Sequence, residues 1–372
     1  MKVLVTGGAG FIGSHIVDKL IEEGHTVRVF DCLEKQVHLG KKPGYLNTNA
    51  EYIFADVRDK THLIKAIKGM EVVFHEAAQV GVGQSMYEIE KYVSHNCDGT
   101  AVLLDVLVNS KHAVKKLIVA SSMSIYGEGA YRCKQCGIVY PGLRPESQLK
   151  NKQWELICPL CGKIIERIPT PETKPTNPTS VYSLSKRFQE DICLQIGKAY
   201  SIPTVAFRYF NAFGPRQSLS NPYTGVAAIF LSRVKNDNAP VIYEDGGQTR
   251  DFIYVDDIAR ANIMAMTDSR ADYEVFNLGT GVPQTIVGIA NTIIELSGKK
   301  GKIEPHILTN YRTGDTRHCY ADTTKISEKL QFQPAVSFKD GMLRLMEWSN
   351  SQKAKDMSEQ AQKELAKRGL VH

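Results

Sequence analysis

The chain has 372 residues, of which 42% are hydrophobic and 23% are charged, which is ordinary for a globular protein that buries a substantial core. Its formal net charge of +6 is mild for this length, and no dense stripe of Lys and Arg accompanies it, which argues against nucleic-acid binding. No apolar run approaches the roughly 18 residues that a membrane helix needs, and no targeting segment precedes the first predicted strand. We therefore expect a cytoplasmic protein that binds neither nucleic acid nor membrane.

The first half of the chain alternates short β-branched runs with amphipathic segments. Residues 2–7 (KVLVTG) predict a strand, residues 12–23 predict a helix with one apolar face, and residues 26–31 (TVRVFD) predict a second strand. The runs YIFADV, EVVFHEAA and KKLIVASS continue the pattern. Apolar strands separated by helices are typical of an α/β fold in which helices cover both faces of a doubly wound parallel sheet.

A glycine-rich sequence, TGGAGFIG at residues 6–13, lies between the first predicted strand and helix. Gly7 allows a tight turn, Gly10 lets the backbone approach a pyrophosphate at the helix N-terminus, and Gly13 allows close packing of the helix on the strand. This context predicts a Rossmann-type dinucleotide site, to which we also assign Phe11 and Ile12.

Two acidic positions follow predicted strands and suit the adenosine half of such a dinucleotide. Asp31 ends the second strand, where a carboxylate accepts hydrogen bonds from ribose hydroxyls and repels a 2′-phosphate, which favours NAD over NADP. Asp56 and Val57 follow the third strand and are placed to contact adenine. For Asp56 a helix N-cap is an alternative that remains compatible with this contact.

Tyr182 and Lys186 are spaced i, i+4, so on a helix they share one face. A nearby ammonium and the positive ring of oxidised nicotinamide stabilise phenolate, which lowers the pKa of Tyr182 and makes it a usable general base. Such a pair is common by chance, but here it follows the glycine-rich turn and a Ser-rich strand end, SSMSIYG at residues 121–127.

At this point the chain resembles the extended short-chain dehydrogenase/reductase family, specifically its nucleotide-sugar epimerases. The resemblance runs from Met1 to about Trp348 and excludes only a cysteine-containing insertion and the last residues. It implies an NAD cofactor, a nucleotide-diphosphate sugar substrate and a homodimer formed through the helices near residues 96–108 and 182–199. The matching segments are TGGAGFIG, HEAA, YVSHNCDGT, SSMSIYG, YSLSK, RYFNAFGPRQ, GGQTRDFIYVDD and NLGTG.

The resemblance also implies individual roles. Ser122, four residues before Tyr126, would hydrogen-bond the reacting sugar oxygen, and Ser124 is the neighbouring candidate. The remaining residues implied to line the cofactor are Ala77, Ala78, Gln79 and Asn96. Those implied to contact substrate are Ser85, Asn211, Arg250, Arg312 and Asp315. Paired Arg residues suit a diphosphate because guanidinium forms forked hydrogen bonds to it.

Two positions after Ser122 bear on which reaction of the family to expect. The 4,6-dehydratases of the family carry Asp-Glu where this chain has Met123 and Ser124, and the decarboxylases carry Glu at the second position. We therefore expect redox-neutral 4-epimerisation. Tyr182 would take the 4-hydroxyl proton while hydride passes from C4 to NAD, and both would return after the 4-keto sugar turns its other face.

The combination of SSMSIYGEGAYRC, the insertion and SNPYTGVAAIF is similar to the dTDP-L-rhamnose 4-epimerases, which form dTDP-6-deoxy-L-talose. A UDP-glucose 4-epimerase, or another nucleotide-sugar epimerase or dehydratase, is the alternative. A different hypothesis is a non-enzymatic relative that binds NAD and contacts RNA or protein through the insertion. Retention of Ser122, Tyr182 and Lys186 together argues against it.

The insertion contains two Cys-x-x-Cys-Gly knuckles, separated by residues 137–157. The 21 residues between them are one more than the usual window of about 15–20 for a four-cysteine zinc site. We still predict such a site from the two knuckles, with unmetallated dithiols or disulfides as the alternative. Four thiolates fill a tetrahedral shell and leave no open position, so the metal would be structural. The insertion could serve as a lid, a dimer contact or a partner surface. The four predicted ligands are Cys133, Cys136, Cys158 and Cys161.

The predicted organisation has four parts. Residues 1–127 and 171–210 form the NAD-binding Rossmann domain, and residues 128–170 form the inserted zinc-ribbon-like segment. Residues 211–350 mainly form a smaller C-terminal lobe that binds the nucleotide sugar. Residues 351–372 form a polar helix or tail.

Overall fold

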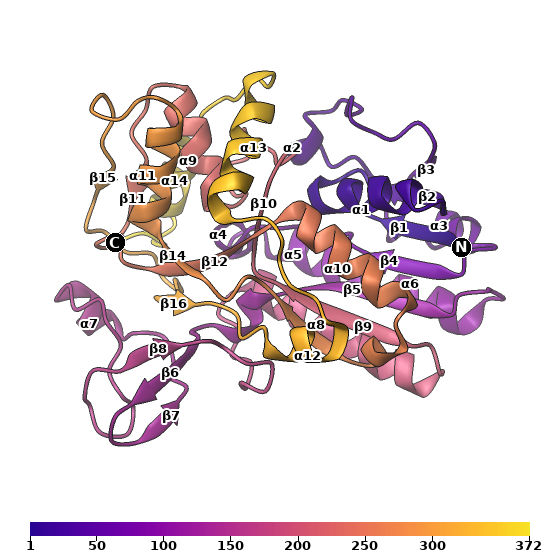
Figure 1. The fold of residues 1–372 in the computed structure, drawn as a ribbon, viewed down its shortest axis with the longest axis horizontal. Helices are drawn as coiled ribbons and strands as arrows, with labels where there is room; N and C mark the ends of the chain where they lie inside the picture. The colour runs from indigo at the N-terminus through magenta and orange to yellow at the C-terminus, as the bar shows by residue number, and fades with distance from the viewer.

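The computed structural model describes all residues, 1–372. Its largest layer is a seven-stranded sheet in the order β13-β9-β5-β4-β1-β2-β3, in which every neighbouring pair is parallel (Figure 1). This confirms the predicted parallel sheet. The strands are β1 (Lys2–Thr6), β2 (Thr26–Asp31), β3 (Glu51–Phe54), β4 (Val72–His75), β5 (Lys116–Ser122), β9 (Thr204–Tyr209) and β13 (Val275–Leu278).

Alternation along the strands supplies two apolar cores, one on each face of the sheet. Val3 and Val5 of β1 belong to a core with α1 (Phe11–Glu22) and α10 (Val255–Thr267), and these two helices pack on each other. Leu4 belongs to the opposite core, with α3 (Lys60–Ile67), α6 (Gly99–Asn109) and α8 (Val181–Ala199). Burial on both faces explains why the strands are apolar at consecutive positions.

The smaller lobe has its own core and a sheet of β10 (Asn211–Phe213), β12 (Thr249–Tyr254), β14 (Pro283–Thr285) and β16 (His318–Cys319). Around it lie α9 (Val226–Lys235), α11 (Ile286–Leu296), α13 (Phe338–Asn350) and the pair β11 (Val241–Ile242) and β15 (His306–Ile307). Residues 211–350 also contribute strand β13 to the seven-stranded sheet. Two of their helices, α10 and α12 (Thr324–Leu330), pack against that part of the molecule. The chain therefore crosses between the two parts more than once.

The insertion forms a separate antiparallel sheet, β7-β6-β8, at the lower left of Figure 1, below β16. It consists of β6 (Ala130–Cys133), β7 (Gly137–Val139), α7 (Glu146–Lys150) and β8 (Glu166–Ile168), and its small core includes Cys133 and Cys158. The remaining elements are α2 (Lys35–His38), α4 (Val82–Ser85), α5 (Ile89–Tyr92), η1 (Val93–Asp98), η2 (Met123–Tyr126), η3 (Ser269–Ala271) and α14 (Ser358–Lys367). None of the helices combines the length and apolar character that crossing a bilayer requires.

Candidate active site

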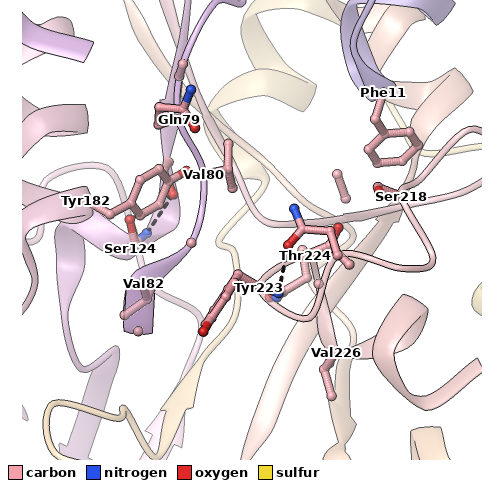
Figure 2. A pocket seen from close by; sticks show the side chains of 18 of the residues that line it. Phe11, Gln79, Val80, Val82, Ser124, Tyr182, Ser218, Tyr223, Thr224 and Val226 are labelled. Atoms are coloured by element: carbon pink, nitrogen blue, oxygen red, sulfur yellow. Dashed lines mark hydrogen bonds between the residues drawn. The ribbon is translucent and has the colours of Figure 1, made fainter. Parts of the chain in front are cut away.

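A cavity of about 660 Å³ lies where the carboxyl ends of the parallel strands face the smaller lobe. Figure 2 shows Tyr182 and Ser124 on one wall, with Tyr223 and Thr224 across the opening. All but two of the predicted cofactor and substrate residues line this cavity; the exceptions are Ser85 and Asn96. Those that line it are Gly7, Gly10, Phe11, Ile12, Gly13, Asp31, Asp56, Val57, Ala77, Ala78, Gln79, Ser122, Ser124, Tyr182, Lys186, Asn211, Arg250, Arg312 and Asp315.

The glycine-rich turn is shaped by two close backbone approaches. Gly7 has a φ of +71°, and a Cβ there would lie 2.7 Å from the Ala77 nitrogen. A Cβ on Gly13 would lie 2.3 Å from the Gly7 carbonyl oxygen, so neither position accepts a side chain. Gly10 is the N-cap of α1, no side chain caps that end, and the first turn has no acidic residue. The exposed N–H groups therefore fit the pyrophosphate of a dinucleotide.

Asp31 is held at the rim of the cavity by two backbone donors. Its carboxylate accepts from the N–H of Ala9 at 3.0 Å and from the N–H of Leu33 at 2.8 Å. Arg28, the cation of the same strand, binds Glu51 and the Ala66 carbonyl, each at 2.8 Å. Because Arg28 is engaged away from the rim, the end of β2 presents a carboxylate, which fits NAD.

Asp56 forms an ion pair with Arg58 at 2.7 Å, which lowers the pKa of its carboxyl group. It is not the N-cap of α3, because that position is occupied by Asp59, whose side chain accepts from the His62 N–H. The N-cap alternative for Asp56 is therefore wrong, and Asp56 lines the cavity beside Val57.

Asn96 is fully buried and hydrogen-bonds the backbone of Gln79, which lines the cavity. Its side-chain oxygen accepts from the Gln79 N–H at 2.7 Å, and its amide group donates to the Gln79 carbonyl at 3.1 Å and to Ser185 at 2.8 Å. Both N–H groups and one lone pair of the side-chain amide are thus used within the protein. Asn96 fixes the segment that carries Ala77, Ala78 and Gln79 and does not itself face the cavity.

Ser85 is also fully buried, behind the first turn of α8. Its hydroxyl donates to the Val82 carbonyl at 2.7 Å and accepts from the Tyr182 N–H at 3.0 Å. The side chain predicted to contact substrate therefore holds the main chain of the predicted base instead.

Tyr182 and Lys186 lie one turn apart on α8 and are both almost fully buried. The Ser122 hydroxyl accepts from the Ser124 hydroxyl at 2.9 Å, and it lies close enough to the Tyr182 phenol to favour a lower pKa of that group. The Lys186 ammonium donates to the Ala120 carbonyl at 2.8 Å. The end of β5 and the start of α8 thus bring together the three predicted catalytic side chains.

The protonation of Tyr182 and Lys186 depends on burial and on Glu76, which was not among the predicted site residues. Burial raises the pKa of Tyr182, and the Ser122 hydroxyl opposes the rise. Burial lowers the pKa of Lys186 to about 8, against the attraction of Glu76. Burial in turn raises the pKa of Glu76 to about 7, and Tyr209 donates to its carboxylate at 2.9 Å. The signal for Glu76 is an acidic residue directly after the apolar strand, in HEAA.

The far end of the cavity carries cations and an unpaired amide oxygen. Arg312 binds Asp315 at 2.7 Å, and Arg250 approaches the other oxygen of Asp315 at 3.5 Å. Burial alone would raise the pKa of Asp315, but the two guanidinium groups lower it. The Oδ1 atom of Asn211 is buried without a partner. Two arginines oriented by a shared carboxylate suit a diphosphate.

The last helix, α14, is part of the cavity wall, although the sequence suggested a peripheral helix or tail. Ala361 and Leu365 are buried and line the cavity, and a Cβ on Gly83 would lie 3.4 Å from Leu365. Arg368 lies over the Tyr87 ring at 4.3 Å. The sequence signal is weak because two apolar residues in a polar helix are easily assigned to a solvated surface.

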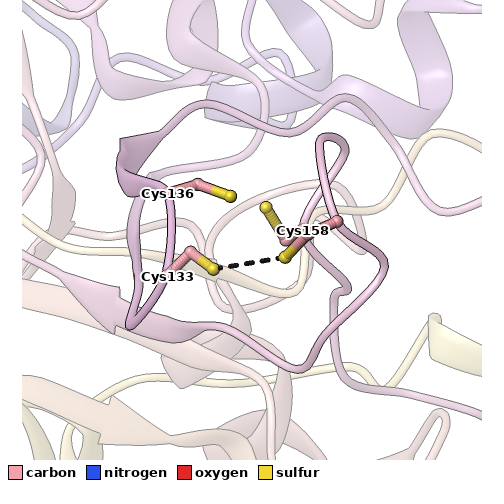
Figure 3. Close-up of side chains that lie close together, drawn as sticks. Cys133, Cys136 and Cys158 are labelled. Atoms are coloured by element: carbon pink, nitrogen blue, oxygen red, sulfur yellow. Dashed lines mark hydrogen bonds between the residues drawn. The ribbon is translucent and has the colours of Figure 1, made fainter.

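The four predicted metal ligands converge at the ends of two turns in the insertion (Figure 3). Their ligand atoms all lie within 4.8 Å of one another, and the sulfurs of Cys133 and Cys161 are 3.6 Å apart. Tetrahedral zinc–thiolate bonds of about 2.3 Å require sulfurs about 3.8 Å apart. The N–H groups of Cys136 and Gln135 lower the pKa of Cys133 to about 6, whereas contact with the other thiols raises the pKa of Cys136 to about 12. The donor set therefore fits zinc.

A parallel sheet with a glycine-rich turn, and a Ser-Tyr-Lys group beside it, define a dinucleotide-dependent enzyme of the Rossmann class. The model of the NAD dependent epimerase/dehydratase family matches residues 3–141 and 159–279, and the residues between these ranges lie in the insertion. The chain belongs to this family, and it is an NAD-dependent enzyme of the epimerase class. This confirms the resemblance drawn from the sequence.

Relatives match over most of their own length. A dTDP-L-rhamnose 4-epimerase of Burkholderia thailandensis is 34% identical over 350 residues, which covers 93% of this chain and 94% of the relative. A putative UDP-glucose 4-epimerase of Methanocaldococcus jannaschii is 34% identical over 348 residues, which covers 93% of this chain and 97% of the relative. The chain is equally similar to these two relatives, whose names give different nucleotides and sugars.

Solved structures share the fold. The UDP-glucose 4-epimerase of Thermotoga maritima, with UDP-glucose, has a TM-score of 0.76 at 34% identity and covers 94% of this chain and 99% of its own. The UDP-glucuronic acid 4-epimerase of Bacillus cereus, with UDP-glucuronic acid and NAD, has a TM-score of 0.77 at 28% identity with the same coverage.

Proposed function

We propose that this enzyme interconverts a nucleotide-diphosphate sugar and its 4-epimer, and that the sugar is a 6-deoxyhexose, with dTDP-L-rhamnose and dTDP-6-deoxy-L-talose as the pair. The observation that supports this reaction is the position of Ser122, Tyr182 and Lys186 together on the wall of one cavity. Met123 and Ser124 stand beside it, and neither can supply the carboxylates that dehydration would need.

In this proposal Ser122 and Tyr182 hold the 4-oxygen of the sugar, and the Tyr182 phenolate accepts its proton. NAD supplies the acceptor, and then the donor, for the hydride of C4. Tyr182 keeps the proton while the 4-ketone presents its other face, and it returns the proton to the 4-oxygen. The Lys186 ammonium stabilises phenolate once Tyr182 has ionised. The overall reaction consumes no oxidant or reductant.

The residues near Tyr182 favour a sugar with a methyl group at C5. Val80, Val82 and Met86 line the cavity and are all exposed large hydrophobic residues, and Leu365 of α14 lies against the neighbouring Gly83. A methyl group is stabilised by such surroundings, whereas a hydroxymethyl or carboxylate group would lose hydrogen bonds to water. UDP-glucose is the second candidate, because the Methanocaldococcus relative and the Thermotoga structure carry that name.

We also propose that the cysteine cluster holds one structural zinc ion. Support comes from the convergence of four ligand atoms and from the lowered pKa of Cys133. A closed four-thiolate shell stabilises a segment whose own core has only six buried residues. The ion would have no open position for substrate and no part in the proton transfer.

A homodimer is the third proposal. Ile89 and Val93 are exposed on α5 and η1, and Leu184 and Phe188 are exposed on the packed helix α8. Apolar side chains gathered on neighbouring helices suit a symmetric contact between two copies.

The test of function incubates purified protein with dTDP-L-rhamnose, UDP-glucose or UDP-glucuronic acid and follows the anomeric signals by NMR. The proposal predicts new signals of the 4-epimer with dTDP-L-rhamnose, at a higher rate than with the other two sugars. Faster turnover of UDP-glucose would replace the proposed substrate. No turnover of any nucleotide sugar by NAD-containing protein would overturn the epimerase proposal and favour a non-enzymatic relative.

A further inference from the structure

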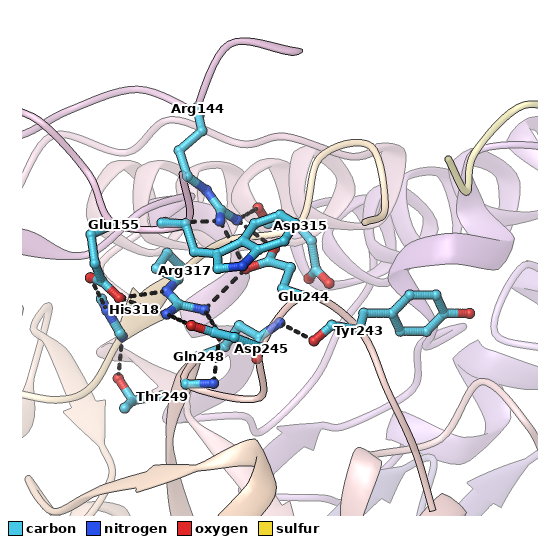
Figure 4. A network of polar contacts seen from close by, with 12 residues as sticks. Arg144, Glu155, Tyr243, Glu244, Asp245, Gln248, Thr249, Asp315, Arg317 and His318 are labelled. Carbon is cyan, nitrogen blue, oxygen red and sulfur yellow. Dashed lines mark hydrogen bonds and ion pairs between the residues drawn. The ribbon is translucent and has the colours of Figure 1, made fainter. Parts of the chain in front are cut away.

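The insertion is joined to the phosphate end of the cavity by a network of charged side chains, of which Arg144, Glu244 and Arg317 are buried (Figure 4). Arg317, which is 2% exposed, lies directly before β16 and at the end of the segment that carries Arg312 and Asp315. Its guanidinium binds Asp245 at 2.6 Å and Glu155 of the insertion, also at 2.6 Å.

A second arginine makes the same connection from the insertion side. Arg144 forms a forked pair with Glu244, with two contacts of 2.8 Å, and both side chains are 1% exposed. The same guanidinium donates to the Asp315 carbonyl at 3.4 Å. Glu244 also accepts from Arg317 at 3.1 Å. The insertion therefore contacts the backbone of the residue that orients both diphosphate-site arginines.

A third contact from the insertion fixes the backbone after Asp315. The carboxylate of Glu128 accepts from the backbone N–H groups of Arg317 and His318, and Tyr131 of β6 donates to it at 2.9 Å. Arg250 in turn donates to the carbonyls of Thr316 at 2.7 Å and Arg317 at 3.2 Å. The position of the Arg250 side chain thus depends on a backbone segment that Glu128 holds.

These contacts carry a definite inference: we propose that the insertion positions Arg250 and Arg312 for the diphosphate of the substrate through Glu128, Arg144 and Glu155. This rests on the proposed function, because a diphosphate must be the ligand of those arginines. Buried ion pairs add little net stability, since desolvation offsets their attraction, but a forked arginine–carboxylate pair such as Arg144–Glu244 fixes the geometry of both side chains. The three residues are positioning residues and do not touch the reacting atoms.

Glu155→Gln tests the inference with the least risk to folding, because the Glu155 side chain is half exposed. The control is Glu166→Gln, which removes a carboxylate of the same insertion from an exposed pair with Lys134 at 3.9 Å. We expect the KM of the nucleotide sugar and the Kd of free dTDP to rise about tenfold in Glu155→Gln, with kcat within about threefold of wild type. Glu166→Gln should match wild type, and NAD content should be unchanged in both.

Thymidine binding separates positioning from general damage, because thymidine lacks the diphosphate. Its Kd should be the same in wild type and Glu155→Gln. Equal dTDP affinity in these two proteins, or an equal loss for thymidine and dTDP, would overturn the inference while leaving the proposed function intact. If the wild-type protein binds neither dTDP nor UDP, the proposed function is contradicted, and the inference that rests on it is contradicted as well. The double variant Arg144→Met/Glu244→Met removes both charges of the buried pair and should likewise raise the Kd of dTDP.

Discussion

The hydroxyl of Ser85 accepts the backbone N–H of Tyr182 at 3.0 Å, so a residue 97 positions earlier in the chain fixes the first turn of the catalytic helix. The N-terminal N–H groups of a helix have no partner within the helix, and this one is buried. Helix α4, whose residues Val82 and Gly83 form part of the cavity wall, is thereby coupled to the position of the phenol.

Ser85→Ala should leave that N–H buried without an acceptor, at a cost of about 1–3 kcal/mol. We expect a lower melting temperature and a reduced kcat, because the start of α8 shifts while Tyr182 itself is retained. Thermal unfolding and steady-state kinetics measure the two effects. A variant with wild-type stability but a raised KM alone would instead support direct substrate contact by Ser85.

The pH dependence of turnover should respond to Glu76. A carboxylate near Lys186 favours its ammonium, so the pKa of about 8 for Lys186 already includes this support. Glu76→Gln removes the negative charge, the pKa of Lys186 falls further, and the ammonium is lost at lower pH. The basic limb of the kcat profile should therefore move to lower pH in Glu76→Gln. An unchanged limb, or one moved to higher pH, would contradict this coupling.

Leu365→Ala should weaken discrimination between sugars. Loss of apolar contact from the cavity wall is worth about 1–3 kcal/mol, or roughly 10–200-fold, in kcat/KM. We expect the ratio of kcat/KM for dTDP-L-rhamnose over a dTDP-hexose with a 6-hydroxyl to fall. The matched control is Lys367→Ala on the exposed side of the same helix, which should leave the ratio unchanged. If the ratio in Leu365→Ala also equals that of wild type, α14 does not contribute to the choice of sugar.

Cys158→Ser should lower the zinc content below one ion per chain and lower the melting temperature. The hydroxyl is a poor substitute for a thiolate in a closed tetrahedral shell. The chemical step should change much less, because the cluster lies outside the cavity. Elemental analysis and thermal unfolding test this, with Cys97→Ser as a control outside the cluster. Full turnover loss in a stable, zinc-replete Cys158→Ser protein would count against a structural role.

The elements with strong periodicity were predictable from the sequence. The β2 prediction, residues 26–31, matches the structure, and α1 differs from its prediction by one residue at each end. The glycine turn, Asp31 and the Tyr182–Lys186 pair were found because each has a local sequence signal next to a strand or helix end. Such signals identify which residues lie at the edge of a parallel sheet.

Residues whose role depends on distant contacts could not be assigned in this way. Ser85 and Asn96 were expected to face ligands, but their side chains hydrogen-bond the backbone groups of Tyr182 and Gln79, which only the tertiary structure brings near them. Glu76 was missed because its environment comes from Lys186 and Tyr209, which are far away in the sequence. The contribution of α14 to the cavity has the same origin.

In the mechanism that we propose, Tyr182 removes and returns the proton of the 4-hydroxyl group. Its most direct test is the rate of sugar interconversion by Tyr182→Phe, measured by NMR on folded protein that retains NAD. We expect a rate lower by about 10²–10⁴-fold, the usual contribution of a general base, with substrate still bound. Interconversion at the wild-type rate in that protein would contradict it.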